Sequence, residues 1–318
     1  MRKKLPFTLI VALAVVLSGC KANKPTATPT PLPKTSATTS ASPTPGACVG
    51  ASAPAQWQHI VVLIFENKTY DEVIGQAPYI TSLADECATV LDWKDADTRV
   101  DGSLDGKYKS KPSYATLTSG LSPSVHGLVN DSYESTTNVD NIYNQLNLAG
   151  LTFKNYQGSE EDGCTVRFAG DYHDALRYYD NIAAICDEHD VSISTFQSDL
   201  ESGNLPAFSM LLPSNDDNMH NNNIYDADEY AQVIMDEILD SPAYAQGDLA
   251  VFFLWDENSP IPNVLLAPSI VPGTKISVEE GNPISHFSAL RTWEEMLGLP
   301  LLGDTPVAPS LLPYFNGS

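Results

Sequence analysis

Two long runs of apolar residues constrain the fold of this chain more than any other sequence feature. Residues 59–65 read HIVVLIF, and residues 248–255 read DLAVFFLW. A strand that is covered on both faces has no polar side, so continuous runs of this kind are typical of strands buried in a parallel sheet. Shorter runs at residues 152–156, 207–212 and 263–267 predict three further strands.

Helical patterns alternate with these strands. Residues 141–149 precede Gly150, and glycine commonly follows the last residue of a helix. Residues 229–239 and 288–297 each place four apolar side chains on one helical face. These are Tyr230, Val233, Ile234 and Ile238 in the first helix and Leu290, Trp293, Met296 and Leu297 in the second. The alternation predicts an α/β fold with a mainly parallel sheet and helices on both faces, in which an active site lies beyond the carboxyl ends of the strands.

The N-terminus has the layout of a bacterial export signal. Basic residues at Arg2–Lys4 precede an apolar stretch at residues 5–17, which is too short for a comfortable membrane-spanning helix. Residues 17–20, Leu-Ser-Gly-Cys, resemble the lipobox of bacterial lipoproteins, in which the cysteine is lipidated. We therefore predict a signal peptide over residues 1–19 and a lipid anchor at Cys20. The alternative is an ordinary signal with an incidental cysteine.

The chain after this signal divides into a linker and a domain. Residues 20–47 consist mostly of Pro, Thr, Ser, Ala and Lys and hold almost no large apolar side chain, which predicts a disordered linker. Residues 48–318 are long enough for one large domain with a substantial core. We expect this domain to lie outside the cytoplasm, anchored to the bacterial cell membrane through its lipid.

Charge is distributed unevenly along the chain. Residues 1–47 hold six of the 17 basic residues and none of the 40 acidic ones, which leaves 11 against 40 and a formal charge of −29 for residues 48–318. A domain this acidic is not expected to bind nucleic acid. If it handles an anionic substrate it needs local cations, and metal ions attracted by carboxylates are the obvious source. The sequence makes no prediction of the oligomeric state.

Four cysteines follow Cys20. An even number in an exported chain predicts two disulfides, for which three pairings are open. We favour pairs between neighbours in sequence, Cys48 with Cys87 and Cys164 with Cys186. The alternative is four free thiols, and the absence of a CxxC spacing argues against a zinc site.

Polar residues follow the ends of the two longest predicted strands. Glu66 and Asn67 come directly after the first strand, and Asp256 and Glu257 come after the second. Carboxylate and amide oxygens are ligands for hard divalent metals, and adjacent carboxylates repel each other unless a cation lies between them. Each pair taken alone also fits a helix start or a solvated loop. Their position at the ends of two strands of one sheet favours a metal site.

A serine and two histidines complete the candidates that the residues themselves suggest. Pro112 suits the first turn of a helix, which would place Ser110 at the helix N-terminus, where anions are favoured and a serine could attack phosphorus. The alternative is a serine that only caps the helix. His220, which closely follows two acidic residues, and His286 are candidates for a metal or phosphate role.

Taken in order, these motifs resemble the phosphoesterase family of the alkaline phosphatase superfamily, which contains bacterial acid phosphatases and phospholipases C. Residues 66–71 resemble the family's opening Glu-Asn-x-x-Phe/Tyr-Asp, and residues 254–257 resemble its Thr-Trp-Asp-Glu. Residues 110–120 resemble its nucleophile segment, and residues 286–300 resemble its closing segment, which ends in Gly-Leu-Pro. The resemblance covers residues 57–305 and implies an alkaline phosphatase-like fold.

The resemblance implies a role for each candidate. Ser110 would be the nucleophile and would form a phosphoserine, while Glu66, Asn67, Asp256 and Glu257 would hold a divalent metal. A further set would bind the phosphoryl group or a second metal: Ser113, His173, Asp216, Asp217, His220 and His286. The sequence fixes neither the identity of the metal nor whether one or two are bound.

The positions at which the sequence differs from the family pattern favour one of the family's activities over the others. Ser113 replaces an asparagine, and Asn218 replaces the aspartate of the family's Asp-Met-His, so the acid that serves beside His220 stays open. Residues 258–263 form a short connection where phospholipase C members carry an insertion. We therefore expect a metal-dependent acid phosphatase that acts on small phosphate esters outside the membrane. The alternatives are a phosphodiesterase or phospholipase C acting on envelope phosphodiesters, and a ligand-binding lipoprotein without catalysis.

Overall fold

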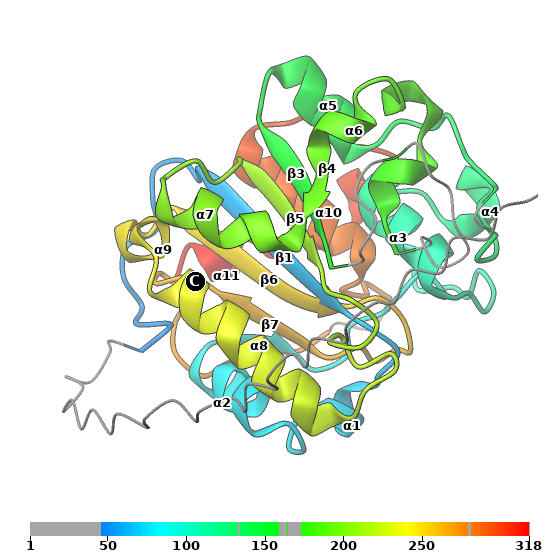
Figure 1. Ribbon diagram of the computed structural model, residues 1–318. Helices are drawn as coiled ribbons and strands as arrows, with labels where there is room; N and C mark the ends of the chain where they lie inside the picture. The colour runs from blue at the N-terminus through cyan, green and yellow to red at the C-terminus, as the bar shows by residue number, and fades with distance from the viewer. Residues whose placement is uncertain (1–45, 133, 159–163, 165–172, 279–280, 318) are drawn as a thin grey trace, which may run out of the picture. The chain divides into compact units, whose positions relative to one another are not determined.

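An eight-stranded sheet runs through the computed structural model, which describes residues 46–132, 134–158, 164, 173–278 and 281–317 (Figure 1). The order of the strands across the sheet is β4-β3-β5-β1-β6-β7-β2-β8. In chain order the strands are β1 His59–Phe65, β2 Ala88–Val90, β3 Phe153–Gln157, β4 Asp190–Ser192, β5 Phe208–Leu212, β6 Leu249–Trp255, β7 Asn263–Leu266 and β8 Thr274–Ile276. All five predicted strands are confirmed, whereas β2, β4 and β8 are too short to show a pattern in the sequence.

The two longest apolar runs form the centre of the sheet. β1 lies between β5 and β6 and runs parallel to both, and every residue of β6 is buried. β7 runs antiparallel to β6 and to β2. A parallel return needs a crossover of a dozen or more residues, and the connection at residues 256–262 is too short for one. The predicted α/β fold with a mainly parallel sheet is confirmed.

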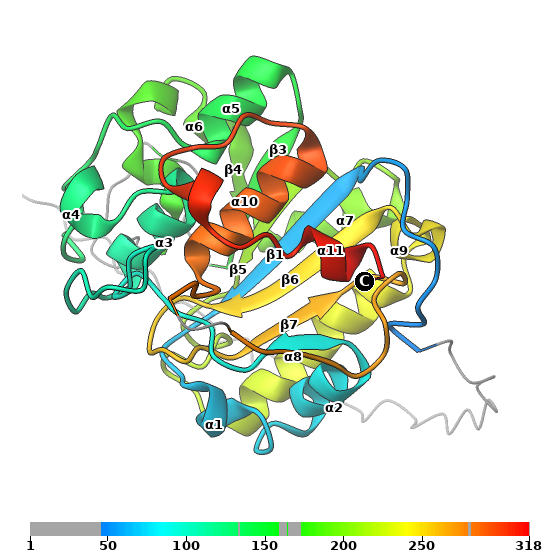
Figure 2. The ribbon, with the colours of Figure 1, turned by 180° about the vertical axis from the view of Figure 1, so that it is seen from behind.

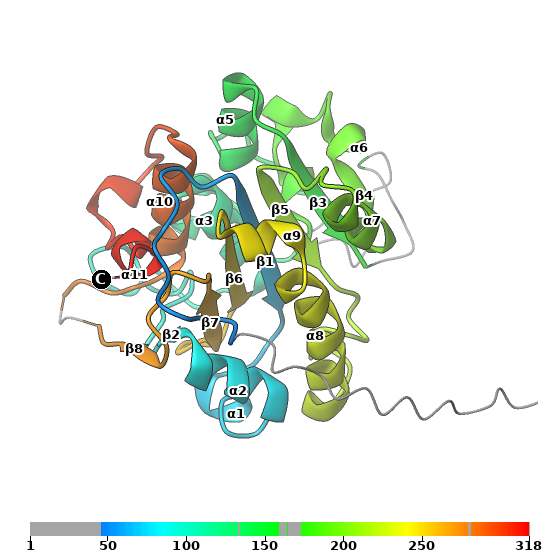
Figure 3. The same ribbon diagram turned by 90° about the vertical axis from the view of Figure 1, so that its left-hand side faces the viewer.

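Helices cover both faces of this sheet, as Figures 2 and 3 show. Helix α3 packs with α10 over one face, and α2 packs with α8 over the other. The α-helices are α1 Tyr70–Val73, α2 Pro78–Glu86, α3 Ser110–Ser119, α4 Pro123–His126, α5 Ile142–Ala149, α6 Cys186–His189, α7 Phe196–Glu201, α8 Ile224–Leu239, α9 Pro242–Gln246, α10 His286–Leu297 and α11 Leu312–Phe315. Short 3-10 helices occur at Ala175–Tyr178, Asp180–Ile182, Ile193–Thr195 and Thr305–Val307.

Helices α5 and α10 agree with their predicted patterns. α5 ends at Gly150, which adopts the left-handed conformation (φ 69°) and closes the helix as predicted. α10 begins at His286, two positions earlier than the apolar pattern indicated, and its four predicted apolar side chains are all buried. His286 therefore lies on the first turn of a helix and not in a polar loop.

Helix α8 corrects one predicted face. It begins at Ile224 rather than at residue 229, because the side chain of Asn223 accepts hydrogen bonds from backbone N–H groups of the first turn. Val233, predicted to be buried, is 60% exposed. The face that packs inward includes Ala227 and Ala231, which are small and carry a weak hydrophobic signal in the sequence.

Two disulfides have the favoured pairing. Cys48 bonds to Cys87, and Cys164 bonds to Cys186. The predicted signal peptide, the lipid anchor at Cys20 and nearly all of the predicted linker lie outside the described residues. The described residues all belong to one compact unit, and none of the helices in them has the length and apolar character needed to span a bilayer.

Candidate active site

The carboxyl ends of β1 and β6 bring two acidic side chains together. The strands pair in register, with Phe65 opposite Trp255, so the residues that follow them emerge side by side. Glu66 and Asp256 are both buried, with exposed fractions of 0% and 1%. The backbone N–H of Asn67 donates a hydrogen bond to Asp256 Oδ1 at 3.2 Å, which links the two strand ends directly.

Ser110 reaches this pair from α3. It is the first residue of the helix, as predicted, and it is buried. Its hydroxyl donates a hydrogen bond to Glu66 Oε2 at 3.3 Å. The other end of α3 is fixed by Gly120 (φ 67°), where an added Cβ would lie 2.9 Å from the carbonyl oxygen of Leu302. The glycine lets α3 sit close to the C-terminal segment, and this places Ser110 against the strand ends.

The N-terminus of α3 offers fewer N–H groups to an anion than its position suggested. The N–H of Lys111 donates to Asp131 Oδ1 at 3.0 Å, and Pro112 has no N–H. The N–H of Ser113 donates to the carbonyl of Lys109. Of the first turn, only Ser110 keeps an N–H without such a bond among the described residues. Binding of an anion at this helix end therefore depends on other groups.

Two aromatic side chains hold Glu66 in place. The hydroxyl of Tyr114, one helical turn after Ser110, donates to Glu66 Oε1 at 2.5 Å. His173 Nε2 lies 3.3 Å from Glu66 Oε2. Tyr114 was not predicted as a site residue. Its spacing of four from Ser110 places both on one face of α3, and this is the signal that could have found it.

The predicted histidines lie on two sides of the carboxylates. The ring of His220 packs edge-on against the ring of His173, with 5.6 Å between centroids. His286 Nε2 donates to the carbonyl oxygen of Asp256 at 2.7 Å. Because a carbonyl only accepts, the proton is on Nε2, and Nδ1 keeps its lone pair. That Nδ1 atom is buried and has no hydrogen-bond partner in the described part of the chain.

Three of the predicted residues do not join this group. Asp217 accepts a hydrogen bond from Ser214 at 2.5 Å, and the exposed Asp216 accepts one from Asn221 at 3.2 Å. Neither aspartate makes a hydrogen bond or ion pair with His220, whose Nδ1 donates to the side chain of Asn221. Ser113 is buried in α3, but no side-chain hydrogen bond joins it to the carboxylates described above. The acids near His220 form local turns instead.

Burial raises the pKa of each carboxyl group in the cluster, and the charge of Asp256 adds to this rise in Glu66 and Glu257. Burial raises the pKa of Glu66 well above its usual range, and the charge of Asp256 raises it further. Burial also raises the pKa of Asp256, although hydrogen bonds from Ser110 and Asn67 work against this. Burial and the charge of Asp256 raise the pKa of Glu257 to about 8. The three groups cannot all ionise near neutral pH unless positive charge is nearby.

The chemistry of these residues fits a divalent cation, although their positions do not yet form a ligand set. No group of three or more His, Cys, Asp or Glu side chains within the described ranges is arranged so that it could hold a metal ion. However, Asp256 Oδ2 and Glu257 Oε2 are buried and lack hydrogen-bond partners among those residues. Buried carboxylate oxygens without partners are the donors that hard divalent metals take.

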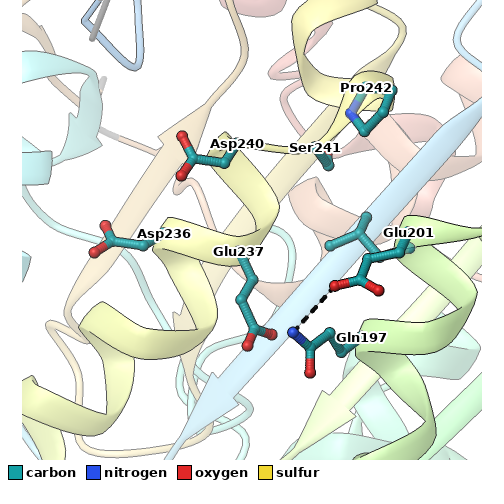
Figure 4. A pocket seen from close by; sticks show the side chains of 8 residues that line it. Gln197, Glu201, Asp236, Glu237, Asp240, Ser241 and Pro242 are labelled. Atoms are coloured by element: carbon teal, nitrogen blue, oxygen red, sulfur yellow. Dashed lines mark hydrogen bonds between the residues drawn. The ribbon is translucent and has the colours of Figure 1, made fainter. Parts of the chain in front are cut away.

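A second set of carboxylates lines a groove between α7 and the C-terminal part of α8, two helices that lie over one face of the sheet (Figure 4). The groove has a volume of about 320 Å³. Its acidic residues are Glu201, Asp236, Glu237 and Asp240, and none of them is buried. Glu201 accepts a hydrogen bond from Gln197 at 3.2 Å. None of the residues predicted to be functional lies there.

Comparison with known proteins identifies the family of this chain. The sequence profile of the phosphoesterase family matches residues 103–286. A phosphatidylinositol-3-phosphatase of Mycobacterium tuberculosis is 28% identical over 279 residues, which are 83% of this chain and 84% of that protein. A probable acid phosphatase of Kluyveromyces lactis is 23% identical over 273 residues, which are 78% of this chain and 60% of that protein.

Solved structures show the same fold. A protein of the alkaline phosphatase superfamily from Vibrio parahaemolyticus superposes with a TM-score of 0.52 at 13% identity, covering 85% of this chain and 72% of that one. This confirms the predicted alkaline phosphatase-like fold, and the match of the family profile confirms the predicted family.

Proposed function

Because this chain belongs to the phosphoesterase family and is a phosphoric ester hydrolase, we propose that it hydrolyses phosphate monoesters through a phosphoserine at Ser110, with the aid of a divalent metal and outside the bacterial membrane. The contact between Ser110 and Glu66 carries this proposal. It supports a nucleophilic role because the serine hydroxyl already donates its proton toward a carboxylate, and a second carboxylate, Asp256, adjoins the first.

The reaction proceeds in two displacements. Ser110 Oγ attacks phosphorus, so that an Oγ–P bond forms and the bond from phosphorus to the ester oxygen breaks. The hydroxyl proton leaves along the hydrogen bond to Glu66 Oε2 and passes to solvent, and the departing oxygen takes a proton from solvent. Water then attacks phosphorus and gives up a proton, the Oγ–P bond breaks, phosphate is released, and Ser110 Oγ takes a proton from solvent.

The remaining residues position the reacting groups. Glu66, Asn67, Asp256 and Glu257 would hold the metal, which would supply the positive charge that favours an ionised serine oxygen and offsets the phosphoryl charge. Tyr114 holds one oxygen of Glu66, so that the other faces Ser110. His173, which lies beside Glu66, and His220, which packs against His173, are candidates for phosphoryl contacts.

The names of the relatives support monoesters over diesters. The proteins of Mycobacterium tuberculosis and Kluyveromyces lactis are both named as phosphatases. The connection between β6 and β7 is too short to contain the insertion that is typical of phospholipase C members. The convergence of Ser110, Glu66 and Asp256 in one buried cluster also weighs against a binding protein without catalysis.

Two disulfides support a site of action outside the cytoplasm, since such bonds persist mainly in oxidising compartments. We place the domain at the outer face of the cell membrane, anchored through Cys20. A Cys20→Ala variant is expected to lose incorporated fatty acid and to leave the membrane fraction. Retention of labelled lipid by this variant would refute the anchor without affecting the chemistry.

The activity is tested with p-nitrophenyl phosphate and its bis-ester. We expect a higher kcat/KM for the monoester, loss of activity in EDTA, and recovery when a divalent metal is returned. A higher kcat/KM for the bis-ester would replace the monoesterase with a phosphodiesterase. Full activity after exhaustive chelation, with metal content measured in parallel, would remove the metal from the proposal.

A further inference from the structure

Nearly every basic side chain in the described residues is already paired. In a domain with a formal charge of −29, cations have many carboxylates to bind. The ion pairs are Lys94 with Asp92, Arg99 with Asp105, Lys154 with Asp199, Arg177 with Asp174 and Asp190, Lys275 with Asp85, and Arg291 with Glu295. Lys68 donates to the carbonyl of Met219, and the buried Lys111 donates to the carbonyls of Ser132 and Ser135.

Lys107 and Lys109 are the exceptions within the described residues. Both are exposed, and the ammonium group of neither makes an ion pair or a hydrogen bond there. Their segment is nevertheless held in place, because the N–H of Tyr108 between them donates to Asp97 Oδ1 at 2.6 Å. In so acidic a domain, two lysines whose ammonium groups make no ion pair or hydrogen bond among the described residues leave positive charge available to an anionic ligand.

The position of Lys109 connects this charge to the active site. Lys109 is the residue before Ser110 and caps α3. Lys107 lies two residues further out. Apart from these two lysines, α3 offers an anion little beyond the N–H of Ser110, as described above.

The geometry of the reaction assigns this charge to one side of the substrate. In-line attack puts the leaving group on the side of phosphorus opposite Ser110 Oγ. Ser110 and Glu66 are buried, so the alcohol part of a bound ester has to extend from them toward solvent, and Lys109, the residue next to Ser110 in the chain, has an exposed side chain. A negative group on an alcohol that extends this way is the ligand that the exposed charge of Lys109 favours.

We propose that Lys109, supported by Lys107, is a specificity-determining residue that binds a second negative charge on the leaving group, so that the enzyme prefers phosphate monoesters of anionic alcohols. This inference rests on the proposed function. The second charge can belong to a soluble alcohol or to a lipid headgroup, since both present the same chemistry. A contact remote from phosphorus binds substrate and transition state alike, so its loss raises KM more than it lowers kcat.

The first test compares glycerol 3-phosphate with 3-phosphoglycerate, which carries a carboxylate in place of a CH₂OH group. We expect the full-length wild-type protein to favour 3-phosphoglycerate. Lys109→Ala should lower the ratio of the two kcat/KM values about fivefold, through KM, which is the scale of one partly exposed charge pair. Lys107→Ala with Lys109→Ala should lower it about tenfold, and high salt should reduce the wild-type ratio.

The matched control is Lys275→Ala. It removes one positive charge from the same domain, but from β8, where Lys275 pairs with Asp85. This variant is expected to keep the wild-type ratio. An equal fall in Lys275→Ala and Lys109→Ala would show an effect of net charge and would overturn the proposal. An unchanged ratio in Lys109→Ala would overturn it as well.

The second test separates the two sources of the charge. The same variants are assayed on a phosphoinositide monophosphate, once as a soluble short-chain form and once in vesicles of a zwitterionic phospholipid. A fall in kcat/KM for Lys109→Ala in both forms supports a leaving-group contact. A fall confined to vesicles would show attraction to an anionic surface and would overturn it. If the wild type hydrolyses none of these esters, the proposed function fails first.

Discussion

Two clusters of carboxylates, one at the carboxyl ends of two central strands and one in a groove between two helices, carry charge of the same sign but differ in burial. Glu66, Asp256 and Glu257 lie at the carboxyl ends of β1 and β6, where burial raises the pKa of each. In the groove between α7 and α8, no acidic residue is buried. Of the groove residues, Glu237 has a raised pKa, through partial burial and the charge of Glu201.

The comparison shows that a cluster of acidic residues does not by itself indicate a functional site in a domain with so many carboxylates. The groove carboxylates are not buried, and Asp236 and Glu201 also accept hydrogen bonds from Tyr79 and Gln197, so their negative charge costs little free energy. The buried cluster cannot use water, and oxygens of Asp256 and Glu257 remain without partners among the described residues. Burying these charges costs free energy, and such a cluster is tolerated when a bound ligand offsets that free energy.

Equivalent substitutions in the two clusters should have very different effects. Asp256→Asn removes a buried carboxylate beside Ser110 and is expected to lower kcat/KM by at least about 10³-fold. Asp236→Asn makes the same chemical change at an exposed groove residue, and its kcat/KM is expected to stay within about twofold of the wild-type value. Both are measured with p-nitrophenyl phosphate at saturating metal. Similar losses in the two variants would remove the distinction between the clusters.

Tyr114→Phe probes what holds the buried cluster in position. It removes the hydroxyl that donates to Glu66 Oε1 while leaving the ring that packs beside His173. Partners that orient a metal ligand typically contribute 10–100-fold, so we expect the affinity for the divalent metal to fall by about that factor. Calorimetric titration of the chelated protein measures it. Wild-type affinity in Tyr114→Phe would show that Glu66 needs no such support.

Glu294 extends the comparison, because it is a buried carboxylate that lies outside the site and has hydrogen-bond partners. Glu294 accepts hydrogen bonds from Thr305 and from the N–H of Leu302, and burial still raises its pKa to about 7. Because the pKa of Glu294 is raised in the folded protein, its carboxyl group ionises at a lower pH in the unfolded chain than in the folded one. The contribution of Glu294 to stability is therefore full below about pH 4.5 and is lost as pH rises through about 7.

Glu294→Gln cannot ionise and should remove that part of the pH dependence. We expect the wild type to lose on the order of 1–2 kcal/mol relative to this variant between pH 4.5 and pH 8, after allowance for partial solvent screening. Urea unfolding at several pH values measures the difference. Parallel stability curves for the two proteins would contradict the assigned pKa.

Relief of repulsion in the groove is the smallest expected effect. Glu201→Gln removes the charge that raises the pKa of Glu237. Since both side chains are largely solvated, a gain of roughly 0.3 kcal/mol is expected, with no change in kcat/KM. Thermal unfolding at low salt measures the gain. A loss of activity in this variant would give the groove a role that its exposure does not suggest.

The sequence predicted the centre of the fold because its strands are long and wholly apolar. β1 occurs at the predicted residues, and the ends of β1 and β6 place Glu66 and Asp256 side by side. Short edge strands such as β4 carry no periodic signal and were missed. The part of the site that the sequence predicted correctly is therefore the part formed at the ends of these long strands.

The rest depended on side-chain directions that a linear pattern does not contain. Asp216 and Asp217 are near His220 in sequence, but they bond to polar groups of their own turn. Tyr114 is linked to Glu66 by a contact between a helix and a strand end. The isolation of Lys109 becomes visible only when the partners of the other basic residues are known.

The central claim is that Ser110 is the nucleophile, and a chemical trap tests it most directly. The enzyme is quenched in acid during turnover of p-nitrophenyl phosphate, digested and analysed by mass spectrometry, with Ser110→Ala as the control. The account predicts one phosphoryl group on the peptide that contains Ser110 and none in the control. Rapid turnover with that peptide unmodified, or with the phosphoryl group on Ser113, would contradict it.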